Sequence, residues 1–146
     1  MPIKTGPKYS NDMIPNKFNL TFIKVLSYIT AIILLQTLYF KFSAHPDSVM
    51  IFSKLGIEPI GRIGLGIIEL IASILLLIPQ TSKFGGLLSM GIMSGAIASH
   101  LLILGIEVND DGGKLFILAI IAWSCSSLIS YIYRNELIQV IKSKHL

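Results

Sequence analysis

Charged residues and cysteines are scarce in this chain of 146 residues. Only 14% of the residues are Asp, Glu, Lys or Arg, whereas a soluble domain has about 25%. This deficit excludes a fully hydrated surface and favours lipid as the solvent of much of the chain. The single cysteine, Cys125, excludes an intrachain disulfide, a CxxC motif and a cysteine zinc cluster. No basic stripe interleaved with aromatic residues argues for a nucleic-acid partner.

Motifs for catalysis and for cofactor binding are also missing. No serine lies in a GxSxG sequence, and no set of Ser, His and Asp residues is expected to lie at the same depth in a membrane. Residues 61–66 follow the order GxxGxG, whereas a dinucleotide fingerprint has the order GxGxxG. One histidine and one glutamate in the apolar runs are too few for a metal site. The sequence contains no haem, nucleotide or metal motif, and it leaves open whether the chain is an enzyme.

Long apolar runs are abundant, since 53% of the residues are hydrophobic and the mean hydropathy is +0.73. Four runs cover residues 22–40, 60–78, 84–104 and 115–133. Each is close to the length of about 20 residues that a helix needs to cross a bilayer. Lipid offers no partner for bare backbone groups, so spanning segments of this kind are helical. The sequence therefore predicts an all-α polytopic membrane protein, an antiparallel bundle of four transmembrane helices.

The segment between the first two runs has a pattern of its own. Three apolar residues recur at three-residue spacing within residues 46–55, and Gly56 and Pro59 follow them. This pattern predicts a short helix in the membrane interface after the first span. We therefore expect a polar N-terminal segment in residues 1–21, the bundle in residues 22–133 and a basic C-terminal tail in residues 134–146.

Basic residues are distributed unequally between the two ends of the predicted bundle. The side with both termini and the turn at Pro79 holds Lys4, Lys8, Lys17, Lys24, Lys83, Arg134, Lys142 and Lys144. The other side holds Lys41, Lys54, Arg62 and Lys114. Because cytoplasmic loops carry an excess of Lys and Arg, both termini are predicted to be cytoplasmic.

A carboxylate, Glu69, lies near the middle of the second apolar run. A charge at this depth costs a few kcal/mol or more. Arg62 lies seven residues earlier, so it shares the helix face of Glu69 two turns away. Lipid would penalise this polar stripe, and we therefore expect it to face the interior of the bundle.

Five polar groups from three helices are predicted to lie in the outer half of the membrane. They are Gln36, Lys41, Arg62, Glu69 and His100. Similar depth suggests one shared pocket that binds a ligand or handles a proton. The alternative is structural: Glu69 pairs with a neighbouring basic residue and fixes the packing of the helices.

Glycines in the second and third runs are candidates for close helix packing. Gly64 and Gly66 precede Glu69, and Gly91 and Gly95 form a GxxxG motif in the third run. Small residues at such spacing let two helix backbones approach closely in a membrane. The neighbour could be a helix of the same chain or of a second copy.

Three stretches carry a further pattern: YFKF after the first run, then FSKLGIEPIGRIGLGIIELIASILLLIP, then MSGAIASHLLILG. In the placement of its Lys, mid-helix Glu and His, the chain resembles the DoxX family of small bacterial membrane proteins. The resemblance covers residues 35–133 and implies a four-helix bundle in the bacterial inner membrane. Some members of that family are named as subunits of thiosulfate:quinone oxidoreductase or terminal quinol oxidase systems. It therefore also implies proximity to quinones or to redox partners.

Two hypotheses about function follow. The first is a redox-associated subunit in which a quinone-like or other small molecule lies among Gln36, Glu69 and His100, next to an oxidoreductase partner subunit. The second is a non-enzymatic scaffold, assembly factor or small-solute permease, with membrane lipids and a homo-oligomer as its partners. The substrate and the partner are not specified by the sequence.

Overall fold

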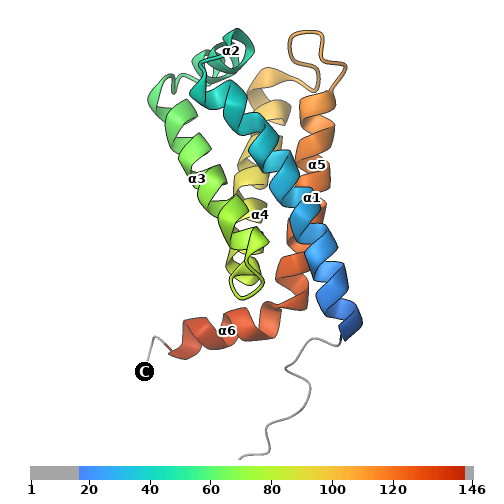
Figure 1. The fold of residues 1–146 in the computed structure, drawn as a ribbon. Helices are drawn as coiled ribbons and strands as arrows, with labels where there is room; N and C mark the ends of the chain where they lie inside the picture. Colours follow the sequence, from blue (N-terminus) through green and yellow to red (C-terminus); the bar gives the residue numbers. More distant parts are fainter. Residues whose placement is uncertain (1–16, 144–146) are drawn as a thin grey trace, which may run out of the picture.

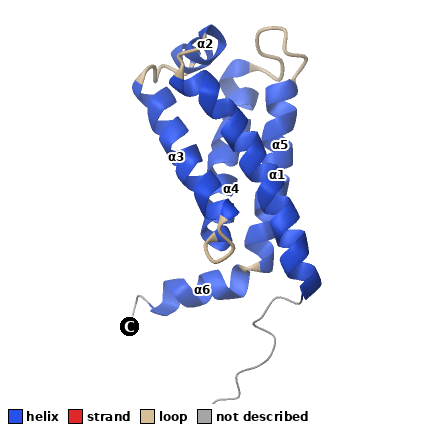
Figure 2. Ribbon diagram, in the orientation of Figure 1, coloured by secondary structure: helices blue, strands red, loops and turns tan. Residues whose placement is uncertain are grey.

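The computed structural model describes residues 17–143, and every regular element in this range is helical (Figure 2). The long helices are α1 (Lys17–Phe42), α3 (Ile60–Leu77), α4 (Ser82–Ser99) and α5 (Lys114–Ile132). A short π-helical turn, η2 (His100–Leu104), continues α4. The expected N-terminal segment up to residue 16 and the last three residues of the expected tail lie outside the described part. Lys4, Lys8 and Lys144 belong to these segments.

Four of these helices are long and apolar enough to cross a membrane. Their spans are Asn19–Phe42, Ile60–Leu77, Ser82–Leu104 and Lys114–Ile132, with 24, 18, 23 and 19 residues. Each lies within a few residues of the run expected from the sequence. The predicted fold class, an all-α polytopic membrane bundle, is confirmed.

The long helices alternate in direction around one core (Figure 1). Both α1 and α4 pack against both α3 and α5. One end, called the outer end below, holds α2 (Pro46–Lys54) and the loop between η2 and α5. The opposite inner end holds the start of α1, the turn between α3 and α4, and α6 (Arg134–Ser143). The short helix predicted after the first span is confirmed as α2, whereas α6 was expected only as part of a basic tail.

Small residues let the helices approach one another. A Cβ atom at Gly85 would lie 2.6 Å from the backbone nitrogen of Leu76, and one at Gly86 would lie 2.7 Å from Cγ2 of Ile129. These two glycines at the start of α4 therefore bring it against both α3 and α5. Large aliphatic side chains instead cover the outside of the bundle. This distribution suits lipid, where van der Waals contact rather than water exclusion holds helices together.

Asp111 organises the loop at the outer end. Its carboxylate accepts hydrogen bonds from the backbone N–H groups of Val108, Gly113 and Leu115, at 3.0, 2.8 and 3.0 Å. Burial raises the pKa of Asp111, but these hydrogen bonds outweigh it and hold the pKa below its ordinary value. The carboxylate thus satisfies N–H groups at the start of α5 that have no partner within the helix.

Candidate functional site

Glu69 is paired with Lys41 inside the bundle. Nζ of Lys41 lies 2.8 Å from Oε2 of Glu69, whose side chain is 3% exposed. Thr37 completes the group: its Oγ1 lies 3.1 Å from the same carboxylate oxygen and accepts a hydrogen bond of 3.0 Å from Lys41 Nζ. Thr37 and Lys41 are one turn apart on α1, so both reach the same point of α3. The carboxylate and the ammonium therefore neutralise each other within the protein.

Arg62 continues this network toward the outer end. Its Nε and Nη2 atoms both lie 2.8 Å from Oε1 of Glu58, one turn earlier. Its Nη1 donates a hydrogen bond to the backbone carbonyl of Lys41. Carbonyls in the last turn of a helix have no partner within it, so Arg62 supplies one to the end of α1. Arg62 and Glu69 thus hold α1 against α3 at two levels.

Gln36 and His100 are not brought to this network. The Gln36 side chain is exposed and lines a different cavity. Nδ1 of His100 lies 2.8 Å from the carbonyl oxygen of Gly105, and its ring meets the Phe116 ring edge-on at 5.5 Å. The structure therefore assembles three of the five predicted polar groups and places the other two apart.

His100 owes its position to the π-helical turn η2. The Gly105 N–H donates to the His100 carbonyl at 2.8 Å, a bond that closes one residue later than in an α-helix. Gly105 then adopts a φ of +85°, which glycine tolerates best. This turn directs the Gly105 carbonyl oxygen toward Nδ1 of the His100 ring. No residue in the described range forms a hydrogen bond with Nε2, the other ring nitrogen.

A cavity of about 430 Å³ lies beside His100, between α2, α3, α4 and α5. Its wall is almost entirely apolar, with Phe52, Leu65 and Met93 among its residues. Gly91 and Gly95 also line it, and a Cβ atom at either would meet no atom within 4 Å. We call this space the His100 cavity. Its size falls within the range of about 300–1,000 Å³ typical of small-molecule sites.

A second, more polar cavity of about 350 Å³ lies at the outer end. Gln36, Asp47, Asn109 and Lys114 contribute to its wall, and Asn109 donates a hydrogen bond to Asp47 across it. Thr37 also lines it, which places one member of the Glu69 network at its surface. The two outer cavities are neighbours, because Ile51 and Leu115 belong to both walls.

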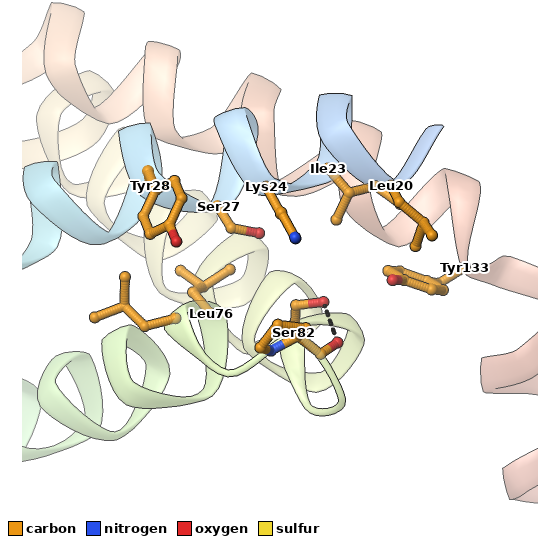
Figure 3. A pocket seen from close by; sticks show the side chains of 10 residues that line it. Leu20, Ile23, Lys24, Ser27, Tyr28, Leu76, Ser82 and Tyr133 are labelled. Atoms are coloured by element: carbon orange, nitrogen blue, oxygen red, sulfur yellow. Dashed lines mark hydrogen bonds between the residues drawn. The ribbon is translucent and has the colours of Figure 1, made fainter. Parts of the chain in front are cut away.

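A third cavity, at the inner end, is much smaller, at about 30 Å³ (Figure 3). It lies between Ser27 and Lys24 of α1 and Ser82 of α4, with Tyr133 at one side. The Ser27 hydroxyl has no hydrogen-bond partner in the described part of the chain. This space suits one or two water molecules and is too small for an organic ligand.

The glycines predicted to pack helices have different surroundings. At Gly66, a Cβ atom would lie 3.0 Å from the Phe42 ring, so the absence of a side chain here lets the end of α1 pack closely against α3. At Gly64, as at Gly91 and Gly95, a Cβ atom would meet open space within this chain. Among the glycines, the closest contacts with another helix fall instead at Gly85 and Gly86, which were not among those predicted.

Sequence reasoning also missed Thr37 and Glu58. Each lies four residues before a basic residue that was selected, Lys41 and Arg62, and so shares its helix face. That spacing was the available signal. Within residues 17–143, no three His, Cys, Asp or Glu residues group in a way that could hold a metal ion. Cys125 is buried in the core.

One comparison with known proteins gives a match. The model of a family described as DoxX-like matches residues 25–124. No curated protein and no solved structure matches the chain. The matched region begins within α1 and ends within α5, so it includes the Glu69 network and the His100 cavity.

Proposed function

The chain belongs to the DoxX-like family, and from this premise we propose that it binds a small, mainly apolar molecule of the quinone type in the His100 cavity. The proposed role is that of a redox-associated subunit, with electron transfer carried out by an oxidoreductase partner. The proposed location is the bacterial inner membrane. The inner end would face the cytoplasm, since five of the nine described Lys and Arg residues lie there and three more are found in the flanking terminal segments of the sequence.

The proposal rests on the burial of His100 and on the hydrogen bonding of its two ring nitrogens. Its side chain is buried, 6% exposed, at the wall of an apolar cavity. With Nδ1–H donated to Gly105, the neutral ring has a free acceptor at Nε2. A quinol hydroxyl donates to this acceptor, and a protonated imidazole donates to a quinone carbonyl. One polar group in an apolar wall is the arrangement that orients a quinone-type head group.

The open face at Gly91 and Gly95 supports the same proposal. These two positions line the His100 cavity and leave space on the side of α4 that faces away from the core. A molecule dissolved in the bilayer reaches the cavity across this face without crossing the polar outer end. A long apolar tail remains in lipid while the head group lies beside His100.

Glu69 has a structural part in this proposal. Its carboxylate is already bound by Lys41 and Thr37, and it does not line the His100 cavity. The Lys41–Glu69 pair fixes α1 on α3, and α3 contributes Leu65 to the cavity wall. The ligand contact is assigned to His100, and Glu69 holds the wall in place.

The proposal is tested by ligand binding to the full chain in lipid nanodiscs. Trp123 is the only tryptophan and joins α5 to α4 through a 2.9 Å hydrogen bond to Ser94, so its fluorescence reports a quinone bound nearby. A short-chain quinone should quench it saturably. His100→Ala should weaken binding about tenfold or more, the effect of one lost hydrogen bond to a buried ligand. Gln36→Ala, in the neighbouring cavity, is the matched control. Equal affinity of the two variants would contradict the assignment.

The alternative function is a non-enzymatic scaffold or assembly factor. One observation favours it: Gly91 and Gly95 have no packing partner within this chain, and small residues in a membrane often receive a second helix. A scaffold predicts that Gly91→Cys forms a crosslink to a second copy or to a partner in native membranes. Quinone binding without such a crosslink would favour the ligand site.

A further inference from the structure

Helix α6 lies crosswise under the inner end of the bundle (Figure 1). Its first turn is held by two contacts. Leu137 is buried in the core together with Tyr133 at the end of α5. Glu136 forms a 2.9 Å ion pair with Lys83 in the first turn of α4. The start of α6 is therefore fixed at the level where the spanning helices end.

The face of α6 that enters the core continues past the bundle. Ile141 lies one turn after Leu137 and so points to the same side of the helix. Ile141 is nevertheless 59% exposed, and the flanking Ile138 is 47% exposed. Asn135 and Gln139 lie on the opposite face, whereas Arg134 and Lys142, each four residues from Ile138, flank the apolar face. Ile138 and Ile141 thus form an apolar surface on the second half of α6 that no described part of the protein covers.

The described charged residues at the inner end are almost all positive. The described basic residues there are Lys17, Lys24, Lys83, Arg134 and Lys142. Glu136 is the single described acidic residue at that end, and Lys83 already pairs with it. Arg134 lies over the exposed Tyr131 ring, 4.2 Å from its centroid; aromatic residues of this kind are enriched at the membrane interface. Within residues 17–143, the remaining cations at this end have no carboxylate to neutralise them.

We propose that α6 is an interfacial helix that rests on the bilayer, with Ile138 and Ile141 against the acyl chains and Arg134 and Lys142 on the phosphates of anionic lipids. An interfacial helix whose apolar face is flanked by basic residues binds such a surface by apolar burial together with charge, and the long Arg and Lys side chains reach the phosphates from the edge of that face. The Lys83–Glu136 pair and Leu137 set the depth of the helix relative to the bundle. This surface is separate from the His100 cavity, and neither proposal depends on the other.

The test measures the depth of α6 in the full chain. Ile141→Cys and Asn135→Cys are made in a Cys125→Ala background and labelled with a fluorophore. The proteins are reconstituted in phosphatidylcholine vesicles, with or without phosphatidylglycerol, that carry nitroxide-labelled lipid. The Ile141 probe should be quenched several-fold more strongly than the Asn135 probe. An Ile138→Cys probe gives a second reading, which should agree with Ile141 if the label has not displaced the helix.

The anionic component is tested by removing charge. Arg134→Gln with Lys142→Gln should reduce quenching at Ile141 in phosphatidylglycerol vesicles to the level seen in phosphatidylcholine. The matched control, Lys54→Gln with Lys114→Gln at the outer end, should leave it unchanged. Equal quenching at Ile141 and Asn135 would overturn the placement of the helix, and insensitivity to phosphatidylglycerol would overturn the role of charge. Quenching that required an added membrane extract would point to a protein partner and also overturn the proposal.

Discussion

Nζ of Lys41 lies 2.8 Å from Oε2 of Glu69, across the contact between α1 and α3. Neither charge is exposed to lipid, because each is the partner of the other and Thr37 bonds to both. The free-energy cost of burying a carboxylate in an apolar helix is thereby offset by one cation, Lys41, which lies 28 residues earlier in the chain.

Removal of one member of this pair should destabilise the bundle. Glu69→Leu leaves the Lys41 ammonium buried without a counter-charge, and such changes cost about 3–5 kcal/mol. Lys41→Met combined with Glu69→Leu should recover most of this loss, because two apolar side chains then meet. The measurement is reversible unfolding in mixed SDS micelles. The partly exposed Lys83–Glu136 pair is the control, and Lys83→Met there should cost at most about 1 kcal/mol. A double variant as unstable as Glu69→Leu alone would show that the two residues are not energetically coupled.

Arg62→Lys should weaken the contact between α1 and α3 although the charge is kept. A lysine cannot bond both Glu58 oxygens and also reach the Lys41 carbonyl, since it lacks the planar fork of donors. We expect a loss of about 1.5–3 kcal/mol, the range for hydrogen bonds to charged groups. The same unfolding assay measures it. Glu58→Gln, which keeps an acceptor for Arg62, should cost less; a larger loss for Glu58→Gln would contradict this ranking.

Two glycines of α4 should respond in opposite ways to a larger side chain. Gly85→Leu should destabilise the bundle by about 1–3 kcal/mol, because its Cβ would lie 2.6 Å from backbone. Gly95→Leu should leave stability unchanged or raise it, since glycine is a poor helix former, but it should fill the His100 cavity and reduce quinone binding. Thermal unfolding and the Trp123 titration measure the two effects. Loss of folding in Gly95→Leu would contradict the open surroundings of this residue.

Asp111 makes stability depend on pH at the outer end. Its pKa is lowered in the folded state by hydrogen bonds from the backbone N–H groups. Its contribution is therefore fully present above the unfolded-state pKa and is lost as the pH falls through the folded-state pKa. Asp111→Ala should cost about 1 kcal/mol at neutral pH, as for other helix caps, and should flatten the acid limb of the stability curve. Asp110→Ala is the control, and an acid limb unchanged in Asp111→Ala would refute the assignment.

The length and composition of the apolar runs were enough to predict the four spans. Their ends agree with the structure within a few residues, because lipid demands both helical backbone and a length of about 20 residues. The inward direction expected for Glu69 and Arg62 is also observed, since both side chains are buried. The pairing of Glu69 with a basic neighbour was one of the two alternatives considered.

The partners within the site were harder to predict. Similar depth placed Gln36 and His100 with Glu69, but depth leaves the rotation of each helix about its own axis undetermined. Gln36 precedes Thr37 by one residue, or about 100° around the helix, and this rotation decides which of them meets Glu69. The π-helical turn at His100 has no signal in hydropathy. The GxxxG motif predicted close packing, yet the tight glycine contacts occur at Gly85 and Gly86, at the inner end of α4.

The turn His100–Leu104 has a genetic consequence. Since it closes one residue later than an α-helical turn, it accommodates one residue more than the helix needs. A chain that lacks one of Leu101, Leu102 or Ile103 should continue α4 as an ordinary helix and still complete the bundle. Such a chain would lose the alignment of the Gly105 carbonyl with the imidazole. A single-codon deletion at this place would therefore separate the folding of the protein from the orientation of His100.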